Sequence, residues 1–217
     1  MAMTSIPTTR LKDGTSIPVI GYGTGAAWFK KKGDTSVNRE LVESIKTAIR
    51  LGYHHLDIKE CGVPRKQLFV TTKVNQNIAN ISKAIEDSLE KLQLSYVDLY
   101  LIHQPFFAKS PTDLQDGWAA MEKVKEAGKA RGIGVSKFLE SHLEIISQSA
   151  KIPPTINQIE YHPYLQHGSL VRITRRRELQ QPITDRSRRL LEREGVRWIR
   201  CCRDRLRSMV LAREKFS

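Results

Sequence analysis

Residues 68–103 read LFVTTKVNQNIANISKAIEDSLEKLQLSYVDLYLIH, and this stretch decides the fold. Its two ends, residues 68–74 and 96–103, are short apolar runs rich in β-branched and aromatic residues, which is typical of strands. Between them, apolar residues recur every three or four positions and predict one face of a helix: Ile81, Ile85, Leu89 and Leu92. A strand, a helix and a second strand in succession predict a parallel β-α-β unit.

The same alternation continues outward in both directions. The Asp13-Gly14 pair between short β-prone pieces predicts an N-terminal hairpin. Further strands are predicted at 18–24, 53–57, 131–136 and 155–163, and further helices at 36–52, 111–130 and 139–150. The pattern therefore predicts a hairpin and six parallel strands covered by helices, in a sheet that either opens into a doubly wound fold or closes into a barrel.

Three chemically active side chains fall near the C-terminal ends of successive strands: Asp57, Lys73 and His103. In a barrel, these strand ends line the mouth of the active site. Each residue alone also has a structural interpretation, since Asp57 could cap the next segment, Lys73 could lie on the surface and His103 could be half-buried. Together at three strand ends, they favour a functional site.

Composition excludes several classes of protein. The chain has 217 residues, of which 40% are hydrophobic, so a sizeable core is possible. Its three cysteines lack the spacing of a zinc site, and we expect no metal. The N-terminus has no apolar signal region, and no apolar run approaches the roughly 20 residues that cross a bilayer. We therefore expect a cytoplasmic protein without a membrane partner.

The formal charge of +13 is unevenly distributed. Residues 1–168 carry 21 basic and 17 acidic side chains, whereas residues 169–217 carry 15 and 6, with arginine replacing lysine. We therefore expect two parts: a folded unit over 1–168, and a divergent Arg-rich tail over 169–217 that is partly helical or disordered. The tail has few aromatic residues and no recognisable module, so we predict no nucleic-acid partner.

Several long motifs in order carry a family resemblance: GYHHLD, GVPRKQLFVTTKV, LQLSYVDLYLIHQP, GKARGIGVS and PPTINQIEYHPYLQ. They resemble the aldo-keto reductases, fungal members most of all. The resemblance implies an incomplete (β/α)8 TIM barrel with an N-terminal hairpin, about six parallel strands and the Arg-rich tail. It also implies an enzyme that reduces a small aldehyde or ketone to an alcohol with NADPH, in a sugar or secondary-metabolite pathway.

The motifs also imply the roles of individual residues. Asp57, Lys73 and His103 match the catalytic aspartate, lysine and histidine of the family, and Trp28 matches a tryptophan of the substrate pocket beside His103. In the family, the lysine ammonium lowers the pKa of a tyrosine that protonates the substrate carbonyl. Asp57 fixes that lysine.

Cofactor contacts are implied at two further positions. Ser136 and Gln158 match residues that hold the nicotinamide carboxamide, with Asp57 close by. The asparagine that normally follows the serine is replaced by Lys137, which loses an amide and adds a charge.

Two segments depart from the family pattern. Only ten residues, 58–67, connect the second predicted strand to the third, although a parallel crossover usually needs about a dozen or more. By the resemblance, the missing residues include the family's proton-donating tyrosine, for which no other tyrosine of the chain is a match. We also expect the outer face of these strands to be poorly covered. The Arg-rich tail shows no seventh or eighth strand and no phosphate site. The alternative function is therefore a catalytically inactive remnant that acts, if at all, as a binding protein.

Overall fold

A computed structural model describes residues 6–11, 13–24, 38–57, 65, 68–75 and 78–160. The N-terminal hairpin pairs β1 (Thr8–Arg10) with β2 (Ser16–Pro18). Six parallel strands follow in the order in which they occur in the chain: β3 (Gly21–Gly23), β4 (His55–Asp57), β5 (Phe69–Val74), β6 (Val97–Ile102), β7 (Ala130–Ser136) and β8 (Asn157–Gln158). The predicted hairpin and the six parallel strands are both confirmed.

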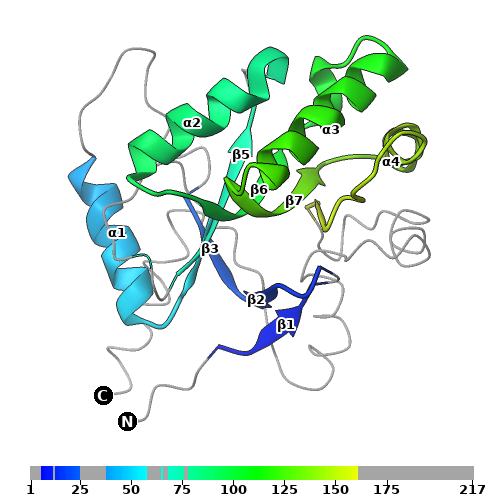
Figure 1. Cartoon of the computed structure of the whole chain (residues 1–217). Helices are drawn as coiled ribbons and strands as arrows, with labels where there is room; N and C mark the ends of the chain where they lie inside the picture. Colours follow the sequence, from blue (N-terminus) through cyan, green and yellow to red (C-terminus); the bar gives the residue numbers. More distant parts are fainter. Residues whose placement is uncertain are drawn as a thin grey trace.

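Helices connect the strands and cover one side of the sheet (Figure 1). They are α1 (Arg39–Arg50), α2 (Ile81–Leu92), α3 (Pro111–Glu126) and α4 (Glu140–Ser147), with short 3-10 turns η3 (Ile78–Asn80) and η4 (Pro105–Phe107). Local sequence sets where they begin. The side chains of Asn38 and Asn80 cap α1 and α2, and Ser110 forms a reciprocal capping box with Asp113 at the start of α3.

The sheet separates two apolar clusters. Side chains on its outer face, such as Val70 and Tyr100, pack with the helices. Side chains on its inner face pack with the hairpin in a second cluster: Leu11, Ile17, Val19, Phe69, Leu99, Leu101 and Ile156. Because side chains alternate along a strand, neighbouring residues of β5 and β6 enter different clusters. The hairpin therefore packs against the inner side of the sheet.

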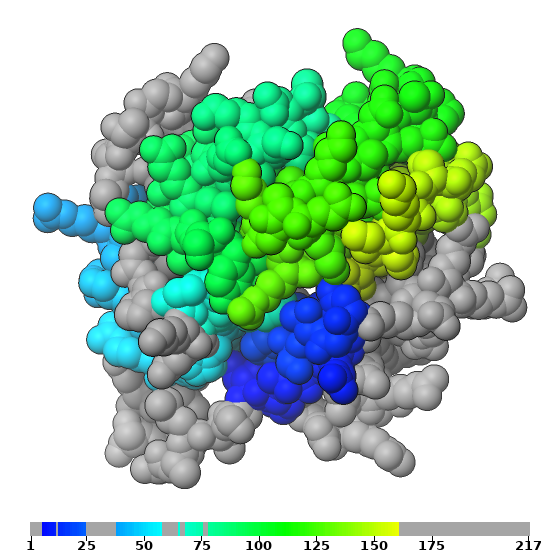
Figure 2. All heavy atoms as spheres, in the orientation of Figure 1, coloured from blue at the N-terminus to red at the C-terminus, as the bar shows by residue number. Residues whose placement is uncertain are grey.

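The hairpin is also held by polar contacts from distant parts of the chain. In Figure 2 it lies (blue) directly below the green and yellow surface of α3 and the segment leading into β8. Asp13 lies 3.7 Å from the Lys125 ammonium and accepts a 3.4 Å hydrogen bond from the Thr155 hydroxyl. These contacts attach the hairpin turn to the end of α3 and to the segment just before β8.

The expectation of poor cover over the second and third barrel strands is wrong for the side chains described. The outward-facing Leu56 of β4 and Val70 of β5 are 0% and 1% exposed. They share one cluster with Ile45 and Ala48 of α1. The outer face of β4 and β5 is thus buried although the connection between them is short.

Arg65 is the one described residue of that short connection, and it is firmly attached. Its guanidinium lies 2.5 Å from the buried Asp98 carboxylate, donates to Leu68 O at 2.5 Å and covers the Tyr96 ring at 4.3 Å. The rest of 58–67, the tail over 169–217 and Trp28 lie outside the described residues. Within the described part, no helix is long and apolar enough to cross a membrane.

Candidate active site

An ion pair joins the second and third strands of the parallel sheet. Asp57 ends β4, and its Cα partner in β5 is Thr71, two positions before Lys73. All three side chains therefore share the inner face. The Lys73 ammonium binds the Asp57 carboxylate, and both side chains are 17% exposed. The predicted association of Asp57 with Lys73 at this edge of the sheet is present.

Gln158 of β8 reaches the same carboxylate. Its Nε2 lies 3.5 Å from Asp57 Oδ2, although β5, β6 and β7 separate the two strands in the sheet. In a flat sheet, strands four places apart would be about 19 Å apart. The contact is possible only because the sheet curls, so its inner face becomes the concave interior of a partial barrel.

Ser136 and Lys137 lie beside Gln158 at the end of β7. The Ser136 hydroxyl and the Lys137 N–H both donate to the Gln158 carbonyl oxygen, at 2.7 Å and 3.0 Å. Lys137 has φ of +60°, in the left-handed region, where asparagine is tolerated better than lysine. The replacement of asparagine by lysine therefore adds backbone strain as well as charge.

The Gln158 side chain has an unused acceptor. Its Oε1 is buried and has no hydrogen-bond partner among the residues that the structure describes. A buried carbonyl oxygen without a donor is unfavourable, so this position suits an incoming N–H group. A carboxamide such as that of nicotinamide offers such a donor, so the described residues fit that part of the cofactor.

His103 lies at the same edge of the sheet, one residue after β6. Its backbone N–H donates to Val74 O at 2.9 Å, and its side chain is half-buried. The backbone bond places His103 next to the end of β5, which also carries Lys73.

The tyrosines of the described segments occupy other places. Tyr22 shares a 2.6 Å hydrogen bond with Ser44, and Tyr96 lies under the Arg65 guanidinium. Tyr100 is buried in the outer cluster, where burial raises the pKa of its hydroxyl, and Tyr53 packs on that cluster ahead of β4. Within the described part of the chain, no tyrosine hydroxyl is placed with the Lys73–Asp57 pair.

A second polar pair lies one layer deeper on the inner face. His55 Nε2 and Thr71 Oγ1 are 2.9 Å apart, and the imidazole meets the Phe69 ring edge-on. Burial lowers the pKa of His55 to about 4, against the opposing effects of Asp57 and a hydrogen bond with the Pro18 backbone. The sequence placed His55 and Thr71 on the functional face by alternation but did not reveal their bond.

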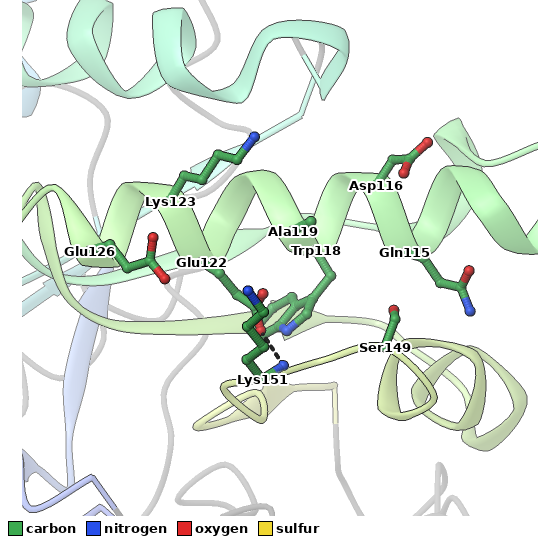
Figure 3. A pocket seen from close by; sticks show the side chains of 9 residues that line it. All are labelled: Gln115, Asp116, Trp118, Ala119, Glu122, Lys123, Glu126, Ser149 and Lys151. Carbon is green, nitrogen blue, oxygen red and sulfur yellow. Dashed lines mark hydrogen bonds between the residues drawn. The ribbon is translucent and has the colours of Figure 1, made fainter.

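The hollow of about 300 Å³ in Figure 3 lies elsewhere, between α3 and the turn before β8. Its central side chains already have structural partners. Glu122 accepts hydrogen bonds from the backbone of Lys151 and Ile152, at 2.8 Å and 2.7 Å, and Trp118 Nε1 donates to Ile152 O at 2.9 Å. We therefore interpret this hollow as part of the contact that holds the turn before β8 against α3.

The sequence profile of the Aldo/keto reductase family matches residues 58–181, more than half of the chain. This chain belongs to the aldo/keto reductase family. Within the described residues, no three histidine, cysteine or carboxylate side chains are grouped to hold a metal.

Individual relatives agree with this assignment. The chain is 41% identical over 166 residues to the NAD/NADP-dependent indole-3-acetaldehyde reductase of Schizosaccharomyces pombe, covering 69% of this chain and 58% of that protein. It is 40% identical over 180 residues to the glyoxal reductase of Bacillus subtilis, covering 75% and 61%. This aldo/keto reductase chain thus spans about three fifths of the length of these curated relatives.

Solved structures give the same result for the fold. An aldo/keto reductase from Brucella melitensis matches with a TM-score of 0.70 and 32% identity, over 82% of this chain and 72% of that one. A Bombyx mori aldo-keto reductase in complex with NADP matches with a TM-score of 0.69 and 30% identity, over 82% and 66%. The curled sheet of this aldo/keto reductase is therefore part of a (β/α)8 barrel.

Proposed function

We propose that the chain carries the carbonyl-reduction site of an NADPH-dependent aldo-keto reductase, which converts a small aldehyde or ketone to the corresponding alcohol. The Lys73–Asp57 ion pair, with the Gln158 carboxamide against the same carboxylate, is the observation that supports this most directly. The pair fixes an ammonium at the C-terminal edge of the curled sheet. A fixed cation there would stabilise negative charge as it develops on a substrate carbonyl oxygen.

A bound nicotinamide cofactor would supply the hydride that reduces the carbonyl carbon. Gln158 is suited to hold its carboxamide, because the free Oε1 can accept an N–H bond. Ser136 supports this arrangement by its hydrogen bond to the Gln158 backbone. Lys137 stands where an amide side chain is usual in the family and contributes a flexible charged side chain instead.

A proton must also reach the carbonyl oxygen. Among the described side chains at this edge, the Lys73 ammonium and the His103 imidazole are the groups able to carry one. The position of the described tyrosines, all away from this pair, supports a second candidate function. In that alternative, the chain binds the cofactor or a small carbonyl compound without turning it over.

Two measurements on the purified full chain separate these functions. The first is a fluorescence titration with NADPH, and the second is NADPH oxidation in the presence of glyceraldehyde. The test variant is Lys73→Met, and the control is Lys91→Met, which removes an exposed lysine of α2.

The reductase function would be supported if the wild-type chain turned over substrate, Lys73→Met abolished this turnover and Lys91→Met preserved it. Saturable binding without turnover would favour the binding protein. If the chain showed no NADPH binding and no turnover, both candidate functions would be refuted.

A further inference from the structure

Two polar pairs on the inner face of the sheet repeat the same diagonal step from β4 to β5. Asp57 reaches Lys73, and one layer deeper His55 reaches Thr71, with the members of each pair 16 residues apart in the chain. Thr71 is also the direct Cα partner of Asp57 in the sheet register. Thr71 therefore lies beside Asp57 in the sheet and is also hydrogen-bonded to His55 in the deeper layer.

The deeper pair is sealed from water. His55 is 3% exposed and Thr71 is 2% exposed. The imidazole is further held by the Phe69 ring, at 5.0 Å between centroids and an interplanar angle of 79°. A neutral imidazole has one donor nitrogen and one acceptor nitrogen, so it can satisfy the Thr71 hydroxyl whichever way that bond runs. The bond therefore holds the Thr71 hydroxyl oxygen against the imidazole.

The direction of that hydroxyl matters because of its neighbour. A threonine side chain chooses among staggered rotamers, and a hydroxyl opposite a carboxylate is a natural donor to it. If the Thr71 hydroxyl turned toward Asp57, it would compete with Lys73 and Gln158 for the carboxylate oxygens. We propose that the His55–Thr71 hydrogen bond positions the Lys73–Asp57 ion pair, by holding the Thr71 hydroxyl one layer away from the Asp57 carboxylate.

His55 and Thr71 are thus positioning residues, which act on the reaction only through Asp57 and Lys73. Their consequence for catalysis rests on the proposed function, but their effect on the ion pair does not. The pair can be observed directly in the protein without cofactor, because an ammonium bound to a carboxylate must leave it and lose a proton before its nitrogen can attack an acylating reagent.

The experiment is competitive labelling of the folded full chain with trace acetic anhydride, quantified for each lysine by peptide mass spectrometry. The rate at Lys73 is divided by the rate at exposed Lys91, which corrects for reagent and pH. His55→Phe removes the partner of the Thr71 hydroxyl, whereas Thr71→Val removes the hydroxyl itself at nearly constant volume. Thr72→Val is the matched control, because Thr72 is equally buried on the same strand but faces outward.

We expect labelling of Lys73 to rise several-fold in His55→Phe, which keeps a ring against Phe69 but frees the Thr71 hydroxyl. Labelling should stay at the wild-type level in Thr71→Val, which has no hydroxyl to compete, and in Thr72→Val. The double variant His55→Phe/Thr71→Val should return to the wild-type level, and His55→Leu serves as the test if His55→Phe fails to fold. Wild-type labelling in a folded His55→Phe protein, or a rise that persists in the double variant, would overturn the inference. An equal rise in Thr72→Val would also overturn it, because the effect would then be general loosening of β5. None of these results depends on turnover, so they remain valid if the reductase proposal fails.

Discussion

Asp98 is a buried charge whose removal should strongly destabilise this fold. Its carboxylate on β6 accepts a 2.8 Å hydrogen bond from the Val70 N–H and lies 2.5 Å from Arg65 Nη2 and 3.3 Å from Arg131 Nη1. The two guanidinium groups also lie 4.3 Å from the Tyr96 ring centroid. One carboxylate thus joins the start of β5, the short connection before it and β7.

The substitution Asp98→Ala leaves the Arg65 charge and the Val70 N–H without their partner. Removing one member of a buried ion pair typically costs about 3–5 kcal/mol, and we expect a loss of that size in the free energy of unfolding. Arg131 is 59% exposed, so its own share is small. Arg131→Met should therefore cost less than about 1 kcal/mol.

Urea unfolding followed by far-UV circular dichroism measures these differences. Asp87→Ala is the matched control, since Asp87 forms a surface ion pair with Lys83 in α2 and its loss should cost at most about 0.5 kcal/mol. The reasoning would be refuted if the free energy of unfolding of Asp98→Ala stayed within about 1 kcal/mol of the wild type, or fell no further than that of Asp87→Ala. Asp98 would then not stabilise the fold through its buried contacts.

Three further outcomes concern stability. The pKa of His55 falls from 6.5 to about 4 on folding, so the unfolded chain binds more protons between these values. The free energy of unfolding should drop by roughly 3 kcal/mol from pH 6.5 to pH 4, a slope that His55→Phe removes. Lys137→Gly should raise stability by up to about 1 kcal/mol in urea titrations, because φ of +60° suits glycine. Gly134→Ala should lower the melting temperature by an amount equivalent to about 1–3 kcal/mol, since a new Cβ would lie 2.6 Å from Ile156 O. A Cβ at Gly23 would meet no atom of the described residues within 4 Å, so Gly23→Ala should change little.

The order and direction of the strands could be predicted from sequence because they depend on local patterns. Alternation within β4 and β5 also placed Asp57 and Lys73 on one face, and their ion pair confirms that placement. The contact of Gln158 with Asp57 could not be predicted from local sequence patterns. It depends on how strongly the sheet curls over five strands.

Two other features could not be predicted from the sequence, for physical reasons. Asp98 sits within an apolar strand and reads as an ordinary polar interruption, because its two arginines come from segments far along the chain. The cover over Leu56 and Val70 was underestimated because each strand was assumed to be covered by the helix that follows it. In the structure, residues of α1 share the cluster that buries them.

The attachment of the hairpin has a consequence for how the chain acquires its structure during synthesis. Leu11 and Ile17 leave the ribosome well before Ile156, which belongs to the same cluster, and Asp13 is bonded to Thr155, 142 residues later. Contacts of such long sequence separation form late, because the intervening chain must be ordered before they can close. At about 5–20 residues per second, the apolar face of the hairpin would wait for roughly ten seconds or longer without its final partners. Among the described segments, the hairpin is therefore one whose apolar face stays without its final partners until Thr155 and Ile156 have emerged.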